Sequence, residues 1–245
     1  MFLLNPHKPD LSLFDPRTQA IITRTIQFFE QKGKRKLKED DHARSWYADL
    51  LEFQKQEKVF ATLLTPSGFG NDSDYRWDTW RNCIFNEILG FYGLAYWYTW
   101  QVSILGLGPI WQSPNDALKR KAAALLQDGE VFAFGLSERT HGADIYSTEM
   151  SLTPQPNGTY RANGEKYYIG NGQIAPMVST FGRFAGTDEY VFFTADFRQS
   201  NYHILSNVTN SQNFVAHFAL RDYPVTSTEI LSRGQEAWDA ALNTV

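Results

Sequence analysis

Residues Phe132–Asp144 read FAFGLSERTHGAD, and this stretch decides the fold of the second half of the chain. The apolar and aromatic run Val131–Leu136 is followed by polar residues, a pattern typical of a buried strand that ends on exposed backbone. A strand end with a small hydroxyl, that of Ser137, and free N–H groups can hydrogen-bond the edge of a planar, polar heterocycle. Phe134 and Leu136 supply apolar walls for such a ligand.

A second stretch, Asn163–Gly172, reads NGEKYYIGNG and repeats this arrangement. Asn163-Gly164 predicts a tight turn, and Glu165–Ile169 predicts a short strand. Gly170–Gly172 ends that strand with backbone that a ligand can approach closely. The two stretches therefore predict two strand ends with exposed polar backbone.

Upstream of these stretches the sequence has a helical period. Asp15-Pro16 predicts the start of a helix that runs to about Gly33, and a second helix is expected from His42 to Glu57. The basic run 32–38 between them is followed at once by acidic residues, which predicts a solvated linker between helices. A loop rich in Pro, Gly, Asn and Asp is expected over 63–74.

A long apolar helix is predicted from Tyr75 onward, because its apolar positions step by three and four residues without a gap. Gly106 and Pro109 are expected to end or break it. Ser113–Asp116 then predicts the N-cap and first turn of a further helix that stops at Gly129. Together these segments predict one antiparallel helical bundle.

At Glu130 the period changes from helical to alternating, and short strands at regular spacing predict a β-sandwich or barrel. After Pro224 the pattern becomes helical again. The fold class is therefore α+β: an all-α helical bundle over 1–129, a β-domain over 130–226, and the first helix of a second helical domain over 227–245. Strands are expected at 131–136, 147–152, 160–162, 165–169, 177–184, 190–197, 202–205 and 214–220.

Composition narrows the classes of function. The chain has 245 residues, 42% of them apolar and 15% aromatic, which is ample for a packed core. A formal net charge of −4 gives no electrostatic footprint for nucleic acid. A single cysteine, Cys83, excludes an internal disulfide and fits a reducing compartment. Residues Met1–Lys8 carry no signal-peptide pattern, and the apolar region 84–111 is interrupted by Glu87, so a cytoplasmic protein without a membrane span is expected.

The two quoted stretches resemble the acyl-CoA dehydrogenase family, whose middle domain carries L-T-E-P-x-x-G-S-D after a hydrophobic strand and later N-G-x-K-x-W-I-T-N-G. Here Leu136–Asp144 reads LSERTHGAD and Asn163–Gly172 reads NGEKYYIGNG, in the same order and at a matching separation. The resemblance extends more loosely over the whole chain, from an aromatic-rich helical first half to a β-rich second half.

The resemblance implies that the two stretches cradle the isoalloxazine ring of FAD. It places Phe134 against the ring, the backbone N–H of Leu136 and the hydroxyl and N–H of Ser137 at the pyrimidine edge, and Tyr168 where the family most often has a tryptophan packed on the ring. Hydrogen bonds at that edge stabilise the reduced, negatively charged flavin. The cofactor-binding residues implied in this way are Phe134, Gly135, Leu136, Ser137, Gly142, Tyr168, Ile169 and Gly170.

Two positions depart from the family pattern. Gly170 replaces a threonine whose hydroxyl lies near the reactive part of the flavin, so that only the N–H remains. Ala143 replaces a serine that hydrogen-bonds the substrate thioester arm in the family. Both changes loosen the implied site.

The activity implied by the resemblance is FAD-dependent α,β-dehydrogenation of an acyl thioester, carried by coenzyme A or by a carrier protein. In the family, a glutamate in a helical domain after the β-domain takes the α proton, so no catalytic base is expected within this chain and the chain alone is expected to be inactive. A homo-oligomer is expected for the full-length protein. The alternatives are a short natural chain paired with a base-bearing partner, a degenerate flavin-binding or structural subunit, and a related flavin oxidase or monooxygenase.

Other groups of reactive residues in the sequence give weaker hypotheses. Ser137, His141 and Asp144 could form a hydrolase triad, but they lie on one short segment with no Gly-x-Ser-x-Gly motif. The five histidines (7, 42, 141, 203 and 217) lack metal-ligand spacing, so no metal site is expected. Glu138 and Asp144 could be a catalytic carboxylate pair, although bonds to local backbone N–H groups are the preferred interpretation. The sequence has no Gly-x-Gly-x-x-Gly motif after a strand, so a nicotinamide site is not supported.

Overall fold

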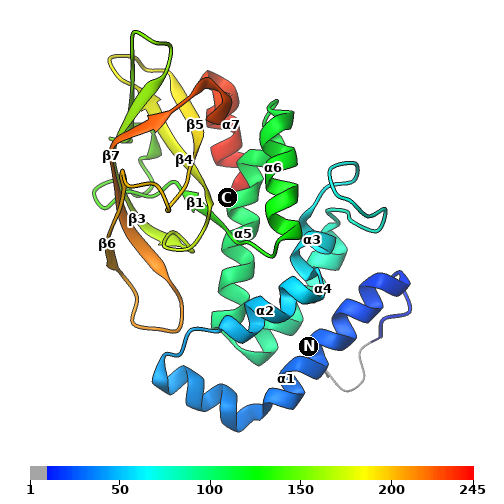
Figure 1. The fold of residues 1–245 in the computed structure, drawn as a ribbon. Helices are drawn as coiled ribbons and strands as arrows, with labels where there is room; N and C mark the ends of the chain where they lie inside the picture. Colours follow the sequence, from blue (N-terminus) through cyan, green and yellow to red (C-terminus); the bar gives the residue numbers. More distant parts are fainter. Residues whose placement is uncertain (1–9) are drawn as a thin grey trace.

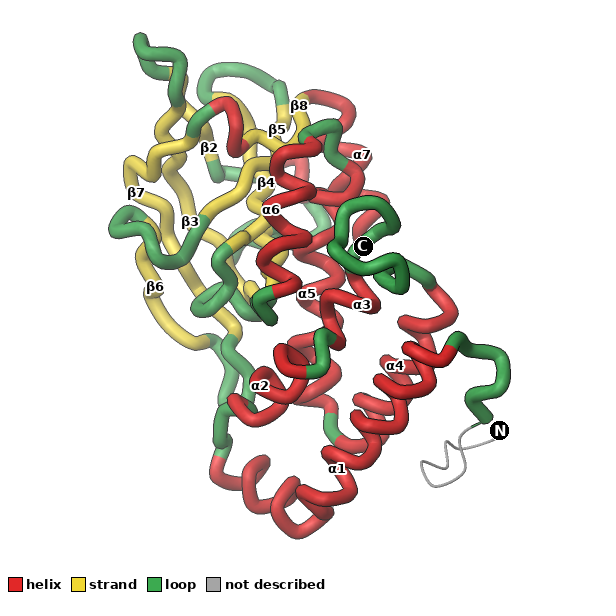
Figure 2. Tube along the Cα trace, turned by 45° about the vertical axis from the view of Figure 1, so that its right-hand side comes forward, coloured by secondary structure: helices red, strands yellow, loops and turns green. Residues whose placement is uncertain are grey.

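The computed structural model describes residues 10–245. The predictions made for Met1–Lys8 and for His7 lie outside this range. Figures 1 and 2 show helices and strands gathered in separate halves that lie side by side, with the last helix of the chain at the junction. The helices of the first half are α1 (Pro16–Ala43), α2 (Ala48–Gln56), α3 (Val59–Leu64), α4 (Thr79–Tyr92), α5 (Leu94–Gln112) and α6 (Asp116–Gln127).

Helix α1 begins where the sequence predicts it. The Asp15 side chain accepts a hydrogen bond from the Thr18 N–H at 2.9 Å, and proline occupies the first helical turn, where a missing N–H has no consequence. Gly33 breaks the helix with a φ of +73°, a backbone conformation that favours glycine. The predicted linker over 32–38 is wrong, because the chain resumes a helix directly after Gly33 and continues to Ala43. The second helix consequently begins at Ala48 rather than at His42.

The single long helix predicted after Tyr75 is wrong. The chain forms two helices, α4 and α5, which meet at Gly93, whose ψ of 133° is extended and takes it out of both helices. Pro109 lies inside α5 instead of ending it. The steps of three and four residues continue across the break, which is why the pattern alone did not reveal it.

Asn115, not Ser113, caps helix α6. Its side-chain oxygen accepts a hydrogen bond from the Leu118 N–H at 3.1 Å, while Ser113 lies at the end of α5. Gly129 follows the helix, as predicted, with a φ of +81°.

The second half of the chain is a mixed sheet in the order β6-β7-β3-β2-β4-β5-β8, with β1 paired to β4. The β1–β4 and β2–β4 pairs are parallel and the others antiparallel. The strands are β1 (Phe132–Gly135), β2 (Ser151–Pro154), β3 (Tyr160–Gly170), β4 (Met177–Phe184), β5 (Tyr190–Ala195), β6 (Tyr202–Asn207), β7 (Val215–Val225) and β8 (Ile230–Arg233).

Several details of the sheet differ from the sequence prediction. The strand expected over 147–152 is observed only at Ser151–Pro154, after a short 3-10 helix at Ile145–Ser147, and the strand expected over 214–220 runs over Val215–Val225. The predicted turn at Asn163-Gly164 is wrong, because β3 runs without interruption from Tyr160 to Gly170 and only its register against β7 shifts at this point. Strand β8 was not predicted; it pairs with β5 and is followed by α7 (Gly234–Thr244). The domain boundary at residue 226 stays a prediction.

Two hydrophobic cores hold these layers together. One lies between the helices and the near face of the sheet and contains Trp100, Phe132 and Phe181 together with residues of α7. The other lies within the β-domain and contains Leu152, Val178 and Phe218. The predicted α+β class, with helices followed by a β-domain, is confirmed. Within residues 10–245, no helix is long and apolar enough to cross a membrane.

Candidate functional site

The two sequence stretches that predicted the site lie next to each other. The N–H of Tyr167, near the end of β3, donates a hydrogen bond to the carbonyl oxygen of Ser137, two residues after β1 ends, at 2.9 Å. The Ser137 side chain is exposed, and within residues 10–245 neither its hydroxyl nor its N–H has a hydrogen-bond partner. The end of β1 therefore presents two unused donors beside the end of β3.

A β-bulge turns Tyr168 out of the sheet. The register of β3 against β7 shifts between Lys166 and Ile169, and Tyr168 has a φ of +67°, which is uncommon for a residue other than glycine. Its side chain is 56% exposed, whereas the next residue, Ile169, is buried in the β-domain core. Bulges re-aim side chains in this way near functional sites. Tyr168 thus presents an aromatic face to a ligand from outside the sheet.

A fully buried ion pair fixes the two strand ends relative to each other. The Lys166 ammonium donates to the Glu138 carboxylate at 2.7 Å and to the Leu136 carbonyl oxygen at 2.9 Å. Glu138 also accepts hydrogen bonds from the hydroxyl of Thr148 and from the N–H of Glu149. The preferred interpretation of Glu138 as a residue that binds local backbone is confirmed, but its main partner, Lys166, was missed.

Each member of this ion pair favours the charged form of the other. Burial would raise the pKa of Glu138, but the charge of Lys166 and the hydrogen bonds from Glu149, Lys166 and Thr148 outweigh it and hold that pKa below its ordinary value. Burial lowers the pKa of Lys166 to about 8, against the opposing charge of Glu138. Both groups are therefore ionised at neutral pH, and Glu138 is unavailable as a general base.

The exposed loop after Ser137 is shaped by a histidine. His141 Nδ1 lies 2.8 Å from Asp144 Oδ2, and its Nε2 lies 3.5 Å from Glu149 Oε1. Since no hydrogen bond in residues 10–245 joins His141 to the Ser137 hydroxyl, these residues do not assemble a triad. Ligand atoms of Glu138, His141 and Glu149 do lie within 4.8 Å of one another, but the Glu138 oxygens are already held by Lys166 and by backbone N–H groups.

The backbone over 170–172 is less open than the sequence predicted. Gly170, Asn171 and Gly172 are all buried. A Cβ on Gly170 would lie 2.7 Å from Val102 Cγ1 and 2.8 Å from the Tyr98 hydroxyl. The atoms that pack closely against this glycine are thus side-chain atoms of α5. The prediction that the backbone here lies open to a ligand is wrong.

The side chain of Asn171 ties helix α5 to both strands of the site. It accepts a hydrogen bond from the Thr99 hydroxyl at 2.9 Å and donates to the carbonyl oxygens of Thr99 at 3.1 Å and Phe132 at 3.0 Å. Asparagine tolerates its left-handed backbone, which has a φ of +60°. From the sequence, Asn171 was expected only as part of the open backbone that ends this strand, although an asparagine between two glycines favours a left-handed backbone.

The remaining residues that were assigned to the site differ in their exposure to solvent. Gly142 and Ala143 lie on the exposed loop, and Leu136 is half-buried. Phe134 and Gly135 are buried, and the ring of Phe134 stacks on Phe192 with centroids 5.9 Å apart. The structure therefore places Ser137 beside the end of β3, leaves Gly142 and Ala143 on the loop that follows Ser137, and makes Phe134 part of the hydrophobic core.

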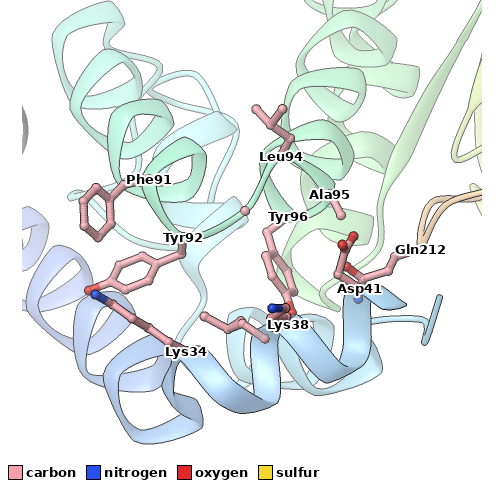
Figure 3. Close-up of a pocket in the computed structure, with 11 residues that line it drawn as sticks. Lys34, Lys38, Asp41, Phe91, Tyr92, Leu94, Ala95, Tyr96 and Gln212 are labelled. Atoms are coloured by element: carbon pink, nitrogen blue, oxygen red, sulfur yellow. The ribbon is translucent and has the colours of Figure 1, made fainter. Parts of the chain in front are cut away.

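A hollow of about 640 Å³ lies away from these strand ends, between the second half of α1 and the junction of α4 and α5. Figure 3 shows Tyr92 and Tyr96 pointing from that junction toward the helix that carries Lys34 and Lys38. None of the predicted site residues lines it. The candidate site is accordingly an open surface at the strand ends.

Comparison with models of protein families finds no match. Comparison of structures finds butyryl-CoA dehydrogenase from Megasphaera elsdenii, with a TM-score of 0.82 and 20% identity over 94% of this chain and 62% of that one. An acyl-CoA dehydrogenase from Bacillus anthracis, solved in complex with FAD, matches with a TM-score of 0.80 and 19% identity over 95% of this chain and 40% of that one. The fold is thus that of the helical and β portions of acyl-CoA dehydrogenases.

Sequence similarity agrees with the fold. The short-chain specific acyl-CoA dehydrogenase of Megasphaera elsdenii is 33% identical over 175 residues, which are 70% of this chain and 45% of that protein. This chain belongs to the acyl-CoA dehydrogenase family. It spans less than half the length of that sequence relative.

Proposed function

We propose that these residues form the flavin-binding part of an FAD-dependent oxidoreductase that removes two hydrogens across the α and β carbons of an acyl thioester. The observation that carries the proposal is the pairing of the Ser137 and Tyr168 strand ends, which places two unused donors beside an exposed aromatic face. The family relationship and the FAD bound to a solved relative support it.

The residues present fit the isoalloxazine ring. Tyr168 offers a flat face for stacking, and Ser137 offers a hydroxyl and an N–H to the polar edge of a ring that lies against that face. The buried Lys166–Glu138 pair and Asn171 hold both strand ends in place, so the donors are positioned before a ligand arrives. FAD, when bound, would supply the acceptor for the hydride that leaves the β carbon.

Removal of the α proton requires a base near the ring. Glu138 is buried and paired with Lys166, and Asp144 pairs with His141 on the loop. The proposal therefore assigns the base to polypeptide outside these 245 residues, consistent with the chain covering only 62% of the butyryl-CoA dehydrogenase structure. A cytoplasmic location and assembly as a homo-oligomer stay predictions.

The first test is flavin binding. Purified chain titrated with FAD should quench flavin fluorescence and shift its absorption bands. Tyr168→Ala should weaken binding about tenfold, because it removes a stacking face that contributes about 0.5–1.5 kcal/mol beyond its buried area. Tyr160→Phe, at the opposite end of β3, is the matched control and should bind as the wild type does. Absence of any saturable binding would contradict the proposal.

The second test is reduction of the bound flavin. Anaerobic addition of a panel of acyl-CoA and acyl-carrier thioesters should bleach the flavin only when a polypeptide that supplies the base is added. The two kinds of thioester separate a coenzyme A substrate from a carrier-bound one. Complete turnover by the 245 residues alone would refute the assignment of the base to another polypeptide.

A second candidate function is that of a flavin-binding subunit without catalysis. It is favoured by Ala143, whose exposed position on the loop lacks a hydroxyl for the thioester arm. That function predicts tight FAD binding without bleaching by any thioester, even with the base-bearing polypeptide present.

A further inference from the structure

Tyr98 of helix α5 reaches the same strand end as the candidate flavin site. Its hydroxyl oxygen would lie 2.8 Å from a Cβ on Gly170, and its Cε1 would lie 2.9 Å from that position. Both distances are shorter than ordinary contacts with a Cβ, so the phenol occupies the space that any side chain at 170 would need. Glycine at 170 and tyrosine at 98 are therefore matched to each other.

The Tyr98 hydroxyl has no hydrogen-bond partner within residues 10–245. This distinguishes it from Tyr202, whose hydroxyl donates to the carbonyl oxygen of Gly172 at 2.7 Å, two residues further along the same segment. Tyr98 is half-buried, and its hydroxyl is not among the fully buried polar atoms without a partner in this part of the chain, so it is open to a group from outside the protein.

The phenol keeps its proton at neutral pH. Burial raises the pKa of Tyr98, and the nearby phenol of Tyr168 raises it further. Gly170, which the Tyr98 ring contacts, is only two residues from Tyr168 on β3. Tyr98 is thus available as a donor toward a ligand that contacts Tyr168.

We propose that Tyr98 is a further cofactor-binding residue, whose hydroxyl donates a hydrogen bond to the polar edge of the flavin ring that lies against Tyr168. This inference rests on the proposed flavin site. Gly170 has no side chain to offer a hydroxyl, and Tyr98 delivers one to that position from helix α5. The site therefore draws on the helical half of the chain as well as on the two strand ends.

The test is Tyr98→Phe, which removes only the hydroxyl. FAD affinity, measured by fluorescence quenching of the full chain, should fall about 2-fold to 10-fold, the range for loss of one neutral hydrogen bond. The reduction potential of the bound flavin should shift as well. The urea midpoint of unfolding should stay unchanged, because the hydroxyl has no partner in the protein, and a merely structural role would lower it.

Three outcomes separate the possibilities. Weaker FAD binding and a shifted potential at an unchanged urea midpoint support the inference, with Tyr160→Phe as the control that loses a hydroxyl elsewhere on β3. Binding and potential equal to those of the wild type, or tighter binding, overturn the role of Tyr98 and leave the proposed function standing. Failure of the wild type itself to bind FAD overturns both.

Discussion

Replacement of Lys166 by methionine should be among the most damaging single changes in the β-domain. The Lys166 side chain is fully buried, and its ammonium is the only cation in contact with the buried Glu138 carboxylate within residues 10–245. Lys166→Met roughly keeps the length of the side chain but removes its positive charge, which leaves the Glu138 carboxylate without a counter-ion. Removal of one partner of a buried ion pair destabilises a protein by about 3–5 kcal/mol.

The double variant Glu138→Gln with Lys166→Met should recover much of this loss. The single amide oxygen of a neutral glutamine can still accept from the Glu149 N–H, and its NH2 group can donate to the hydroxyl oxygen of Thr148, since these two groups bind different oxygens of Glu138 in the wild type. The charge that the single variant strands is then absent, and replacing a whole buried pair is often nearly neutral. The two substitutions should therefore be strongly non-additive.

Urea unfolding, followed by tryptophan fluorescence and circular dichroism together, measures both effects. Lys166→Met should lower the midpoint by about 1 M or more, with the slope unchanged. Lys121→Met, on the exposed face of α6, is the matched control and should stay within about 0.5 kcal/mol of the wild type. A single variant within about 1 kcal/mol of the wild type, or additive effects in the double variant, would refute the role of the ion pair.

Three further predictions concern the strand ends and the loop. Gly170→Ala should lower the free energy of unfolding by about 1–3 kcal/mol, because its Cβ would overlap Tyr98 and Val102; an unchanged urea midpoint would contradict the packing described. Asn171→Leu should lower it by about 2–4 kcal/mol by leaving buried groups of Thr99 and Phe132 unpaired, as differential scanning calorimetry would reveal. The bond to Asp144 raises the pKa of His141, and the same contact lowers the pKa of Asp144. The stability from His141 is thus complete below about pH 6.5 and lost as pH rises through its raised pKa, while that from Asp144 is complete above about pH 3.9 and lost as pH falls through its lowered pKa. Limited proteolysis of the loop should be slowest between these limits, and Asp144→Asn should return the NMR-titrated pKa of His141 toward its ordinary value.

The sequence was most informative where local pattern and tertiary contact agree. Strand β1 and the cap at Asp15 followed from residue order and cap chemistry, whereas the proximity of the two motif stretches was implied by the family resemblance. The break at Gly93 did not, because the apolar period continues on both sides of it and one extended residue leaves no mark on that period. Gly33 marked a helix end correctly, but the charges after it suit the exposed face of a helix as well as they suit a linker.

The buried contacts behind the site could not be predicted from the local sequence pattern. Lys166 is buried with Glu138 opposite it, and that pairing joins strand β3 to the loop that follows β1, 28 residues away in sequence. Tyr98 read as one more apolar position of a buried helix, and its contact with Gly170 depends on how α5 crosses β3. Side chains whose role is set by a partner distant in sequence give no periodic signal.

The bulge that carries Tyr168 makes this position nearly independent of the packing that stabilises the fold. Since this ring is part of neither hydrophobic core, mutations there should leave the folded state almost as stable as before, even if they alter the proposed flavin site. Rings such as Phe181 and Phe218 lack that freedom, because they are fully buried. Under the proposed function, the affinity for a cofactor can therefore be tuned at Tyr168 without an accompanying loss of foldability.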